Sequence, residues 1–253
     1  MPHVPDELVA LCRYLGDPAL DGAVLAEGNS SIRADEESFW VKASGFSMRE
    51  IEASGFVRVN FAPIYRALSG EPDDDRVREI LKASRADDTP LMPSVETFMH
   101  AYLLGLPDVE IVGHTHPTPL VSLLCTENPE HLARQRLFPD EVVCCGPAAA
   151  FVPYVDPGFR LAGAVRASVE QFVEEHGSLP KTIWLQNHGL IALGKSPREI
   201  ESATQMSIKA ARVWLAAVSS GRKLSPLTKE QIERIHTRPD EHYRQKLLWE
   251  LRK

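Results

Sequence analysis

Two histidines separated by a single residue follow an apolar run near the middle of the chain. His114 and His116 come directly after residues 109–113, which are predicted to form a buried strand. Residues i and i+2 of an extended chain point to the same side, so both imidazoles can reach one ion. His188 lies between two further strand-like runs, where Gly189 permits a tight turn. Three neutral imidazoles with one open position are common in catalytic zinc sites, although an H-x-H pair alone also occurs among ordinary surface and core histidines.

A glutamate precedes this histidine pair on a predicted helix over residues 93–104. Ser94 is the expected N-cap, which places Glu96 in the first turn, where the helix N-terminus favours a carboxylate. Glu96 is therefore either a glutamate that only stabilises the helix, or a general base or metal ligand that faces the histidines. His100 follows four residues later and can be a ligand, a group behind the ligands or a residue of the helix face.

Three short segments have the composition of an anion-binding loop. Residues 26–31 combine small side chains, free backbone N–H groups and hydroxyl donors, and Ser44-Gly45 offers a second turn of this type. Ser94 adds a hydroxyl at a predicted helix start. Each segment is also compatible with an ordinary loop. No Walker loop and no G-x-G-x-x-G motif occurs, so nucleotide binding is not predicted.

The elements that position these residues follow from the apolar pattern. Helices are predicted at residues 8–15, 118–125, 158–175 and 197–219. Strands are predicted at residues 31–33, 38–42, 56–61, 109–113, 141–145, 182–185 and 190–193. Residues 69–90 are the most polar part and are predicted to be a surface insertion with one short helix or, alternatively, a disordered linker. Several strands meet without intervening helices, which favours one α/β domain with an antiparallel or mixed sheet over a dinucleotide-binding fold.

The composition is that of an ordinary globular protein, with 43% hydrophobic and 25% charged residues. The 28 basic and 35 acidic side chains give a net charge of −7, which argues against nucleic acid or an anionic membrane and favours a small-molecule partner. We see no signal peptide in the first twenty residues and no run of eighteen apolar residues. The four cysteines form no C-x-x-C pair and are predicted to be reduced thiols of a cytoplasmic protein.

Five blocks of this sequence together resemble the class II aldolase/adducin family. Its best-known enzymes are the fuculose-phosphate and rhamnulose-phosphate aldolases and ribulose-phosphate 4-epimerase. The blocks occur in the family's order and cover roughly residues 5–220 of a single predicted domain, 1–253, which ends in helices at 228–251. The blocks are Gly28-Asn29-Ser30-Ser31-Ile32-Arg33, Lys42-Ala43-Ser44-Gly45, Pro93-Ser94-Val95-Glu96, Val112-Gly113-His114-Thr115-His116 and Asn187-His188-Gly189-Leu190.

The resemblance implies a fold, a cofactor and residue roles. The implied fold is a single three-layer α/β/α domain around a mainly antiparallel central sheet, assembled as a homotetramer with active sites at subunit contacts. The implied cofactor is a divalent metal, most readily Zn²⁺, which stabilises the enediolate left when a carbon–carbon bond of a sugar-derived substrate breaks. The implied roles are metal ligation by His114, His116 and His188, proton transfer by Glu96, and substrate-phosphate binding by Gly28, Asn29, Ser44, Gly45 and Ser94.

The sequence departs from the family pattern at two places. Ala26 and Val95 stand where sugar-phosphate aldolases carry a threonine and a serine, so we expect a substrate with a carboxylate or without any phosphate. The family's tyrosine proton donor would fall near Leu137-Phe138, where no tyrosine stands. Nearby residues that could replace it are Asp140, Glu141 and Tyr154.

The predicted function is a metal-dependent lyase of the aldolase type in carbohydrate metabolism. The same metal site also serves epimerases, dehydratases and decarboxylases of the family. The glutamate at position 96 favours aldol chemistry, because the epimerases carry aspartate there. A non-catalytic, adducin-like scaffold is the alternative from another class, and it would be expected to have lost the three histidines, which are all present here.

Overall fold

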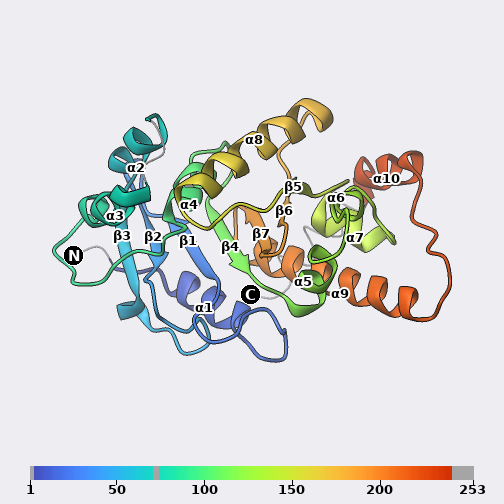
Figure 1. Cartoon of the computed structure of the whole chain (residues 1–253), viewed down its shortest axis with the longest axis horizontal. Helices are drawn as coiled ribbons and strands as arrows, with labels where there is room; N and C mark the ends of the chain where they lie inside the picture. Colours follow the sequence, from blue (N-terminus) through green and yellow to red (C-terminus); the bar gives the residue numbers. More distant parts are fainter. Residues whose placement is uncertain (1–2, 71–73, 241–253) are drawn as a thin grey trace.

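One sheet organises the chain. The structure is a computed structural model that describes residues 3–70 and 74–240, and within these ranges seven strands form a single sheet in the order β3-β2-β1-β4-β7-β6-β5 (Figure 1). Neighbouring strands run antiparallel, except that β5 and β6 are parallel. The strands are β1 (Asn29–Arg33), β2 (Ser38–Lys42), β3 (Phe56–Asn60), β4 (Ile111–Thr115), β5 (Ala150–Val152), β6 (Thr182–Leu185) and β7 (Gly189–Gly194).

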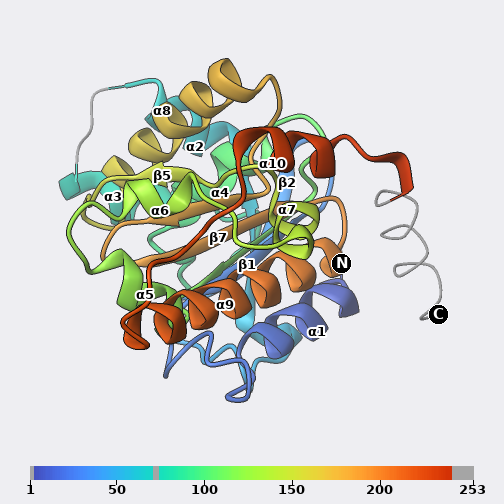
Figure 2. The same cartoon turned by 90° about the vertical axis from the view of Figure 1, so that its right-hand side faces the viewer.

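Helices cover both faces of this sheet. In Figures 1 and 2, α4 and α8 lie on one side of the sheet and α1, α5 and α9 on the other, while α6, α7 and α10 gather near the β5 edge. The predicted three-layer α/β/α arrangement around a mainly antiparallel sheet is therefore confirmed. The helices are α1 (Asp6–Leu15), α2 (Phe61–Leu68), α3 (Val77–Ser84), α4 (Thr97–Leu104), α5 (Thr118–Leu124), α6 (Glu130–Ala133), α7 (Pro139–Cys145), α8 (Phe159–His176), α9 (Pro197–Ser219) and α10 (Lys229–His236), with short 3₁₀ turns at Ala53–Gly55 and Asp74–Arg76.

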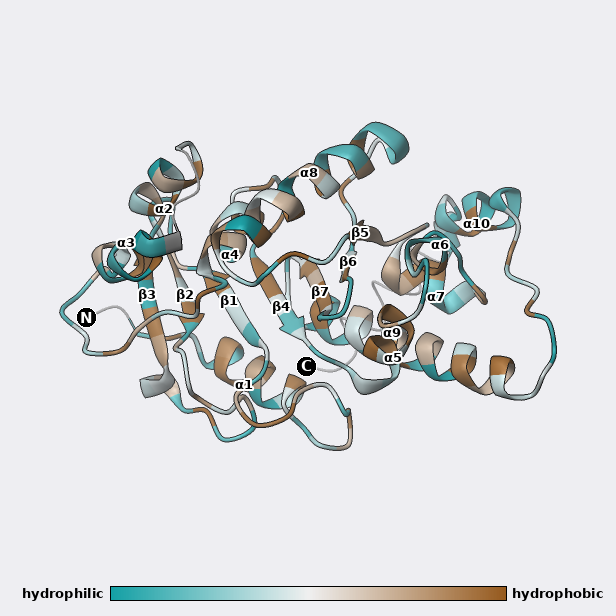
Figure 3. Ribbon diagram, in the orientation of Figure 1, coloured by the Kyte–Doolittle hydropathy of each residue, from teal (hydrophilic) through white to brown (hydrophobic). Residues whose placement is uncertain are grey.

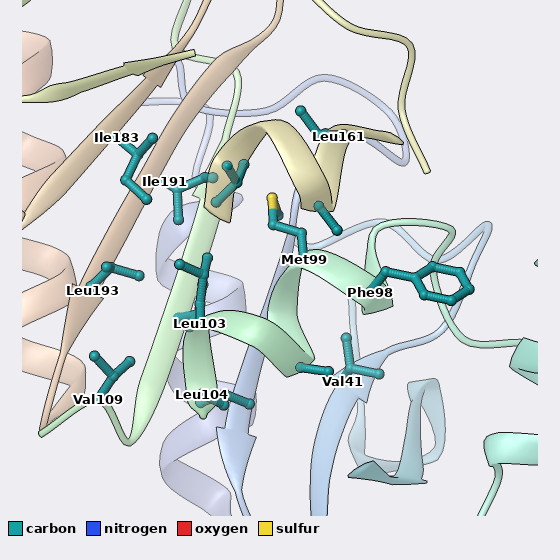
Figure 4. Packing of buried hydrophobic residues seen from close by; sticks show 14 of the residues in the cluster. Val41, Phe98, Met99, Leu103, Leu104, Val109, Leu161, Ile183, Ile191 and Leu193 are labelled. Carbon is teal, nitrogen blue, oxygen red and sulfur yellow. The ribbon is translucent and has the colours of Figure 1, made fainter. Parts of the chain in front are cut away.

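Apolar residues fill both interfaces between the sheet and its helices. Figure 3 shows hydrophobic residues along the central strands and on α5 and α9, whereas the outer end of α8 and most of α10 are hydrophilic. On the α4 side, Met99 and Leu103 pack in the same cluster as Ile191 of β7 and Leu161 of α8 (Figure 4). This packing holds α4 over the central strands, which matters because α4 follows directly after Glu96.

The prediction of a strand at residues 141–145 is wrong, because this segment forms α7. Pro139 occupies the first turn, where its missing N–H costs nothing, and Asp140 and Glu141 add acidic groups at the helix N-terminus. Gly146 then ends the helix with a φ of 80°. These end signals outweigh the β-type side chains Val142 and Val143 between them.

Several predicted boundaries also shift. The prediction of a helix start at Ser94 is wrong: α4 begins at Thr97, and Glu96 is its N-cap. The strand predicted at 31–33 begins two residues earlier, because Asn29 and Ser30, predicted as part of a loop, pair with β4 and start β1. The predicted strand over 56–61 stops at Asn60, and α2 begins at the next residue.

The two least regular parts of the chain also contain helix. Residues 69–90 hold the helix α3, while residues 71–73 of this segment lie outside the described ranges. Of the predicted C-terminal helices over 228–251, α10 occupies Lys229–His236, and residues 241–253 lie outside the described ranges. Among the helices of the described residues, none has both the length and the apolar character needed to cross a lipid bilayer.

Candidate metal centre and active site

Strand β4 points His114 toward the layer of α4. Val112 belongs to the core cluster that contains α4 residues, and His114, two residues later, shares its face of the sheet. Asn29 of β1 lies opposite His114 on one side, and Ile191 of β7 lies opposite it on the other. His114 is therefore fully buried in the middle of the sheet. The strand predicted from the sequence ends at Gly113, whereas β4 extends to Thr115 and so includes the first histidine.

The three predicted metal ligands converge. His116 follows β4, and His188 sits in the turn between β6 and β7, where Asn187 takes a φ of 55°. One ring nitrogen from each of the three histidines lies within 4.8 Å of the other two. The Nε2 atoms of His114 and His116 are 2.9 Å apart, and the ring centroids are 4.7–4.9 Å apart. The structure thus brings together three residues that are separated by as many as 74 positions in the sequence (188 − 114).

Glu96 supplies a fourth donor atom to the same point. Its Oε1 lies 3.4 Å from Nε2 of His114 and 3.2 Å from Nε2 of His188. Ligand atoms of a tetrahedral zinc site with bonds of 2.0–2.1 Å are separated by roughly 3.3 Å, which these distances match. Nδ1 of His114 donates to the Leu190 carbonyl over 3.0 Å, so its Nε2 carries the lone pair that faces the cluster. We call Glu96, His114, His116 and His188 the histidine cluster, and its donor set fits a divalent metal.

Burial and mutual charge set the protonation of the histidine cluster. Burial alone would raise the pKa of Glu96, but the adjacent His114 and His188 hold it well below its usual value. Burial alone would lower the pKa of His114, yet the Glu96 carboxylate raises it. Burial, together with the charges of His114 and His188, lowers the pKa of His116 to about 3. Without metal, the lowered pKa of Glu96 and the raised pKa of His114 favour an ionised pair of these two groups, while the lowered pKa of His116 keeps it neutral.

A buried chain of hydrogen bonds supports Glu96 from behind. Nδ2 of Asn29 donates to Glu96 Oε2 over 2.7 Å and lies 3.2 Å from the Ser94 hydroxyl. Because the amide N–H groups point this way, Asn29 Oδ1 must accept from Nε2 of His100. Nδ1 of His100 then accepts from the Ser31 hydroxyl at 2.6 Å. His100 is fully buried, which lowers its pKa to about 3 and keeps it neutral. The sequence left three roles open for His100, and these contacts support that of a group behind the predicted ligands.

The residues predicted to bind an anion gather beside this chain. Asn29 contacts Ser94 directly, and the Ser44 N–H bonds the Met92 carbonyl at 2.9 Å, which places the Ser44-Gly45 turn next to the strand-like segment before Ser94. Gly28 has a φ of 67° and lies so close to the His114 carbonyl that a Cβ would approach it to 2.6 Å. The Asn29 amide, however, is fully engaged by protein groups, so it offers no free donor to a ligand.

Two charged residues at the site were not singled out from the sequence. Lys42 is 2% exposed, and its Nζ donates to the carbonyls of Phe46 at 2.6 Å and Ala26 at 3.2 Å, which ties together the two predicted anion-binding loops. Burial lowers the pKa of Lys42. Glu27 lies with its Oε1 3.8 Å from Nδ1 of His116. For Lys42, the one signal in the sequence for a buried charge is its place directly after the apolar run 39–41. For Glu27, no local pattern indicates a place near the histidines.

The suggested replacements for the missing tyrosine are not equally placed. Glu141 is 1% exposed and is held by Arg136 and by the Leu137 N–H, so it is not available to a substrate. Tyr154 is exposed, and its hydroxyl donates to Asp156 at 2.9 Å. Its backbone N–H bonds the side chain of Gln186, two residues before His188. Tyr154 therefore lies on the segment beside the candidate metal centre, whereas Asp140 lies in the first turn of α7.

A sizeable cavity lies away from the histidine cluster. A cavity of about 860 Å³ opens at the opposite end of the sheet, where β4 begins and β7 ends, and is lined by residues such as Tyr102, Val169, Leu179 and Leu193. None of the predicted site residues lines it, and it contains no histidine or cysteine. We therefore locate the active site by its convergent donor atoms rather than by cavity volume.

Comparison with known proteins identifies relatives of this chain. The family model for the class II aldolase and adducin N-terminal domain matches residues 6–215. The chain belongs to the class II aldolase and adducin family. A curated relative, the uncharacterized oxidoreductase YuxG of Bacillus subtilis (strain 168), is 26% identical over 224 residues, which are 82% of this chain but 30% of the relative. This chain thus spans less than a third of the length of that relative.

Solved structures of class II aldolase type show the same fold. The N-terminal class II aldolase domain of a conserved protein from Thermoplasma acidophilum superposes with a TM-score of 0.65 and 25% identity, covering 83% of this chain and 92% of that one. YgbL of Escherichia coli, described as a putative aldolase/epimerase/decarboxylase, superposes with a TM-score of 0.67 and 19% identity, covering 92% and 97%. At such identities the likeness to YgbL concerns the fold alone.

Proposed function

We propose that this class II aldolase family member is a metal-dependent lyase, with Zn²⁺ as its metal, that cleaves or forms a carbon–carbon bond in a small polyoxygenated carbonyl compound. The observation that carries the proposal is the convergence of three imidazole nitrogens and Glu96 Oε1 on one point. His114, His116 and His188 would hold the ion. When bound, the metal would polarise the substrate carbonyl and stabilise negative charge that develops beside it.

Glu96 is the proposed proton carrier. Its Oε2 is held by the Asn29 amide, so Oε1, which faces the point where the histidines converge, is the oxygen that would reach the substrate. The lowered pKa keeps Glu96 ionised, which is the form of a carboxylate that can accept a proton from the substrate carbon or hydroxyl. The Ser31–His100–Asn29 chain holds the carboxylate in one orientation, which serves a general base because proton transfer depends on geometry first.

The proposed substrate lacks a phosphate group. Ala26 and Val95 provide no hydroxyl, Val95 is 47% exposed, and the Asn29 amide is engaged within the protein. Each missing hydrogen bond to a charged group costs about 1.5–3 kcal/mol of binding. We therefore favour a substrate whose anion is a carboxylate, or a neutral one.

We further propose that the enzyme acts in the cytoplasm as a homotetramer. All four cysteines lie among the described residues and none forms a disulfide, which agrees with a reducing compartment. Leu25 is 87% exposed and Val95 47% exposed, and both adjoin site residues, as expected where a neighbouring subunit covers the entrance.

Metal analysis and turnover test the proposal together. Purified wild-type protein should carry one divalent ion per chain, and His188→Ala should lose it. Glu96→Gln should retain most of the metal while kcat falls about a hundredfold or more, and Glu36→Gln, an exposed glutamate in the β1–β2 turn, should behave as wild type.

The assay is a panel of phosphorylated and unphosphorylated ketoses and hydroxy acids with product analysis. Carbon–carbon cleavage supports the lyase, whereas epimerised, dehydrated or decarboxylated products would assign the same site to the alternative reactions. A near wild-type kcat in Glu96→Gln would contradict the role of Glu96. A wild-type protein without stoichiometric metal would favour the adducin-like scaffold.

A further inference from the structure

The loop between α1 and β1 is attached to the segment that carries the two neighbouring histidines. The backbone N–H of His116 donates to the Gly22 carbonyl over 2.7 Å. Thr118 makes two bonds to Asp21, from its N–H to the carbonyl at 3.2 Å and from its hydroxyl to the carboxylate at 2.9 Å. These bonds fix the loop relative to His116, so any side chain that the loop directs toward this ring has a defined position.

Glu27 is the side chain that the loop directs there. Its backbone N–H bonds the Val24 carbonyl at 3.1 Å, and its Oε2 accepts from the Val24 N–H at 2.9 Å, so the residue closes a tight turn on itself. One carboxylate oxygen is thereby held, and the other, Oε1, lies 3.8 Å from Nδ1 of His116. The Glu27 side chain is 43% exposed and that of His116 is 20% exposed, so the pair lies at the rim of the site.

The ring of His116 requires a partner on this side. Its Nε2 points into the histidine cluster, 2.9 Å from Nε2 of His114, which leaves Nδ1 on the outer edge. Histidines that bind metals usually donate their second ring N–H to a carbonyl or carboxylate, which fixes the tautomer and raises the basicity of the ligand. For His114 this partner is the Leu190 carbonyl, at 3.0 Å from Nδ1. For His116 the carboxylate on this side is that of Glu27, at an ion-pair distance of 3.8 Å from Nδ1.

We infer that Glu27 is a positioning residue for the metal centre, whose carboxylate accepts the Nδ1–H of His116 and so holds Nε2 toward the ion. The inference rests on the proposed metal site and names a residue outside the three histidines and Glu96. It has a consequence for specificity. Glu27 and Glu96 together place two carboxylates around one divalent ion, so the centre carries little net positive charge, which agrees with a substrate that lacks a dianionic phosphate.

Zinc affinity of the full chain tests this inference. The variant Glu27→Gln keeps an oxygen that accepts the Val24 N–H, but it removes the charge and places an amide NH2, which cannot accept the Nδ1–H, on the side of His116. Glu36→Gln is the matched control with an exposed glutamate at the other end of β1. Metal-free proteins are titrated with Zn²⁺ in competition with a chromophoric chelator. We expect Glu27→Gln to bind Zn²⁺ about 10–100-fold more weakly than wild type and Glu36→Gln to bind as wild type.

Two further measurements separate positioning from support of the loop. The melting temperature of metal-free Glu27→Gln should equal that of wild type, because the turn bond is kept, and the visible spectrum of the Co²⁺-loaded protein should change with the altered ligand. Equal Zn²⁺ affinity in wild type and Glu27→Gln would overturn this inference and leave the proposed function intact. A wild-type protein that binds no Zn²⁺ would overturn both.

Discussion

Two buried clusters of charged groups in this protein differ in how their polar atoms face one another. Arg136 is 1% exposed and donates to the carbonyls of Gly146 at 2.8 Å, Gln135 at 2.9 Å, and Ala133 and Cys145 at 3.3 Å. Its partner Glu141 lies 3.8 Å away and accepts the Leu137 N–H at 2.7 Å. We call these groups the Arg136 cluster, in which every contact joins a donor to an acceptor.

In the histidine cluster, ring nitrogens and a carboxylate oxygen converge on one point. Two Nε2 atoms lie 2.9 Å apart, and Glu96 Oε1 is shared between His114 and His188. Such a convergence suits a proton or a cation placed among these atoms. Buried charge by itself therefore does not mark a functional site: the contacts of the Arg136 cluster are made within the protein, whereas the atoms of the histidine cluster converge on a point where a cation fits.

The largest effect that this comparison predicts is on stability, at the Arg136 cluster. Arg136→Met removes the guanidinium, which leaves Glu141 buried without its counter-charge and the carbonyls at the end of α7 without this donor. We expect the free energy of unfolding to fall by about 3–5 kcal/mol. The measurement is denaturant unfolding of metal-free protein, in which this cluster should matter as much as in the metal-loaded form.

Arg134→Met is the matched control for this prediction. The Arg134 side chain is 50% exposed and pairs with Glu130 and Glu175 at the surface, so its loss should cost at most about 1 kcal/mol. The double variant Arg136→Met/Glu141→Leu should recover part of the stability, because no buried charge is then left unpaired. Equal losses at Arg134 and Arg136 would show that the Arg136 cluster contributes nothing beyond a surface pair.

An intermediate effect is expected at the chain behind Glu96, which resembles the Arg136 cluster in its matched donors and acceptors. His100→Leu leaves Asn29 Oδ1 and the Ser31 hydroxyl without their partner. We expect a loss of about 1–3 kcal/mol in the free energy of unfolding. His131→Leu, at an exposed position of α6, is the control and should change it little. An unchanged stability in His100→Leu would mean that the chain is not needed to hold Asn29.

The sequence predicted helices and strands correctly where their signals lie within the segment itself. The apolar run at residues 109–113 predicted the strand that leads to the histidine pair, and Pro197 with the apolar period after it predicted α9. At 141–145 the sequence also contains the signals for the two ends of α7, Pro139 and Gly146. The β-branched residues between them favoured a strand, and this prediction was wrong. The roles of the predicted site residues stay predictions, although the structure brings these residues together.

The remaining features depend on pairing between distant segments. The bond between Asn29 and His100 joins residues 71 positions apart, and it exists because Asn29 of β1 is in register with His114 of β4. The contact between Glu27 and His116 depends on how the loop after α1 docks on the end of β4. No periodicity or capping rule encodes such a register, so a sequence alone leaves the groups that support the ligands unassigned.

The smallest expected effect is a change in pH dependence that is confined to the histidine cluster. Glu96 has a folded-state pKa below its ordinary 4.5, so its contribution to stability is complete above 4.5 and is lost as the pH falls through the lower value. His114 has a pKa above its ordinary 6.5, so its contribution is complete below 6.5 and is lost as the pH rises through the higher value. The pair therefore stabilises metal-free protein most between pH 4.5 and 6.5.

The comparison of metal-free wild type with Glu96→Gln across pH isolates this contribution. The melting temperature of wild type relative to Glu96→Gln should be highest inside that window and should decline above it, as His114 loses the proton that Glu96 stabilises. Zn²⁺ must displace the same proton, so its affinity for wild type should rise with pH over the range in which the stability difference declines. Arg136→Met should leave this profile unchanged in shape, because the Arg136 cluster makes no contact with His114. A stability difference that is constant across pH would show that no proton is held between His114 and Glu96, and that the two clusters do not differ in the way the structure indicates.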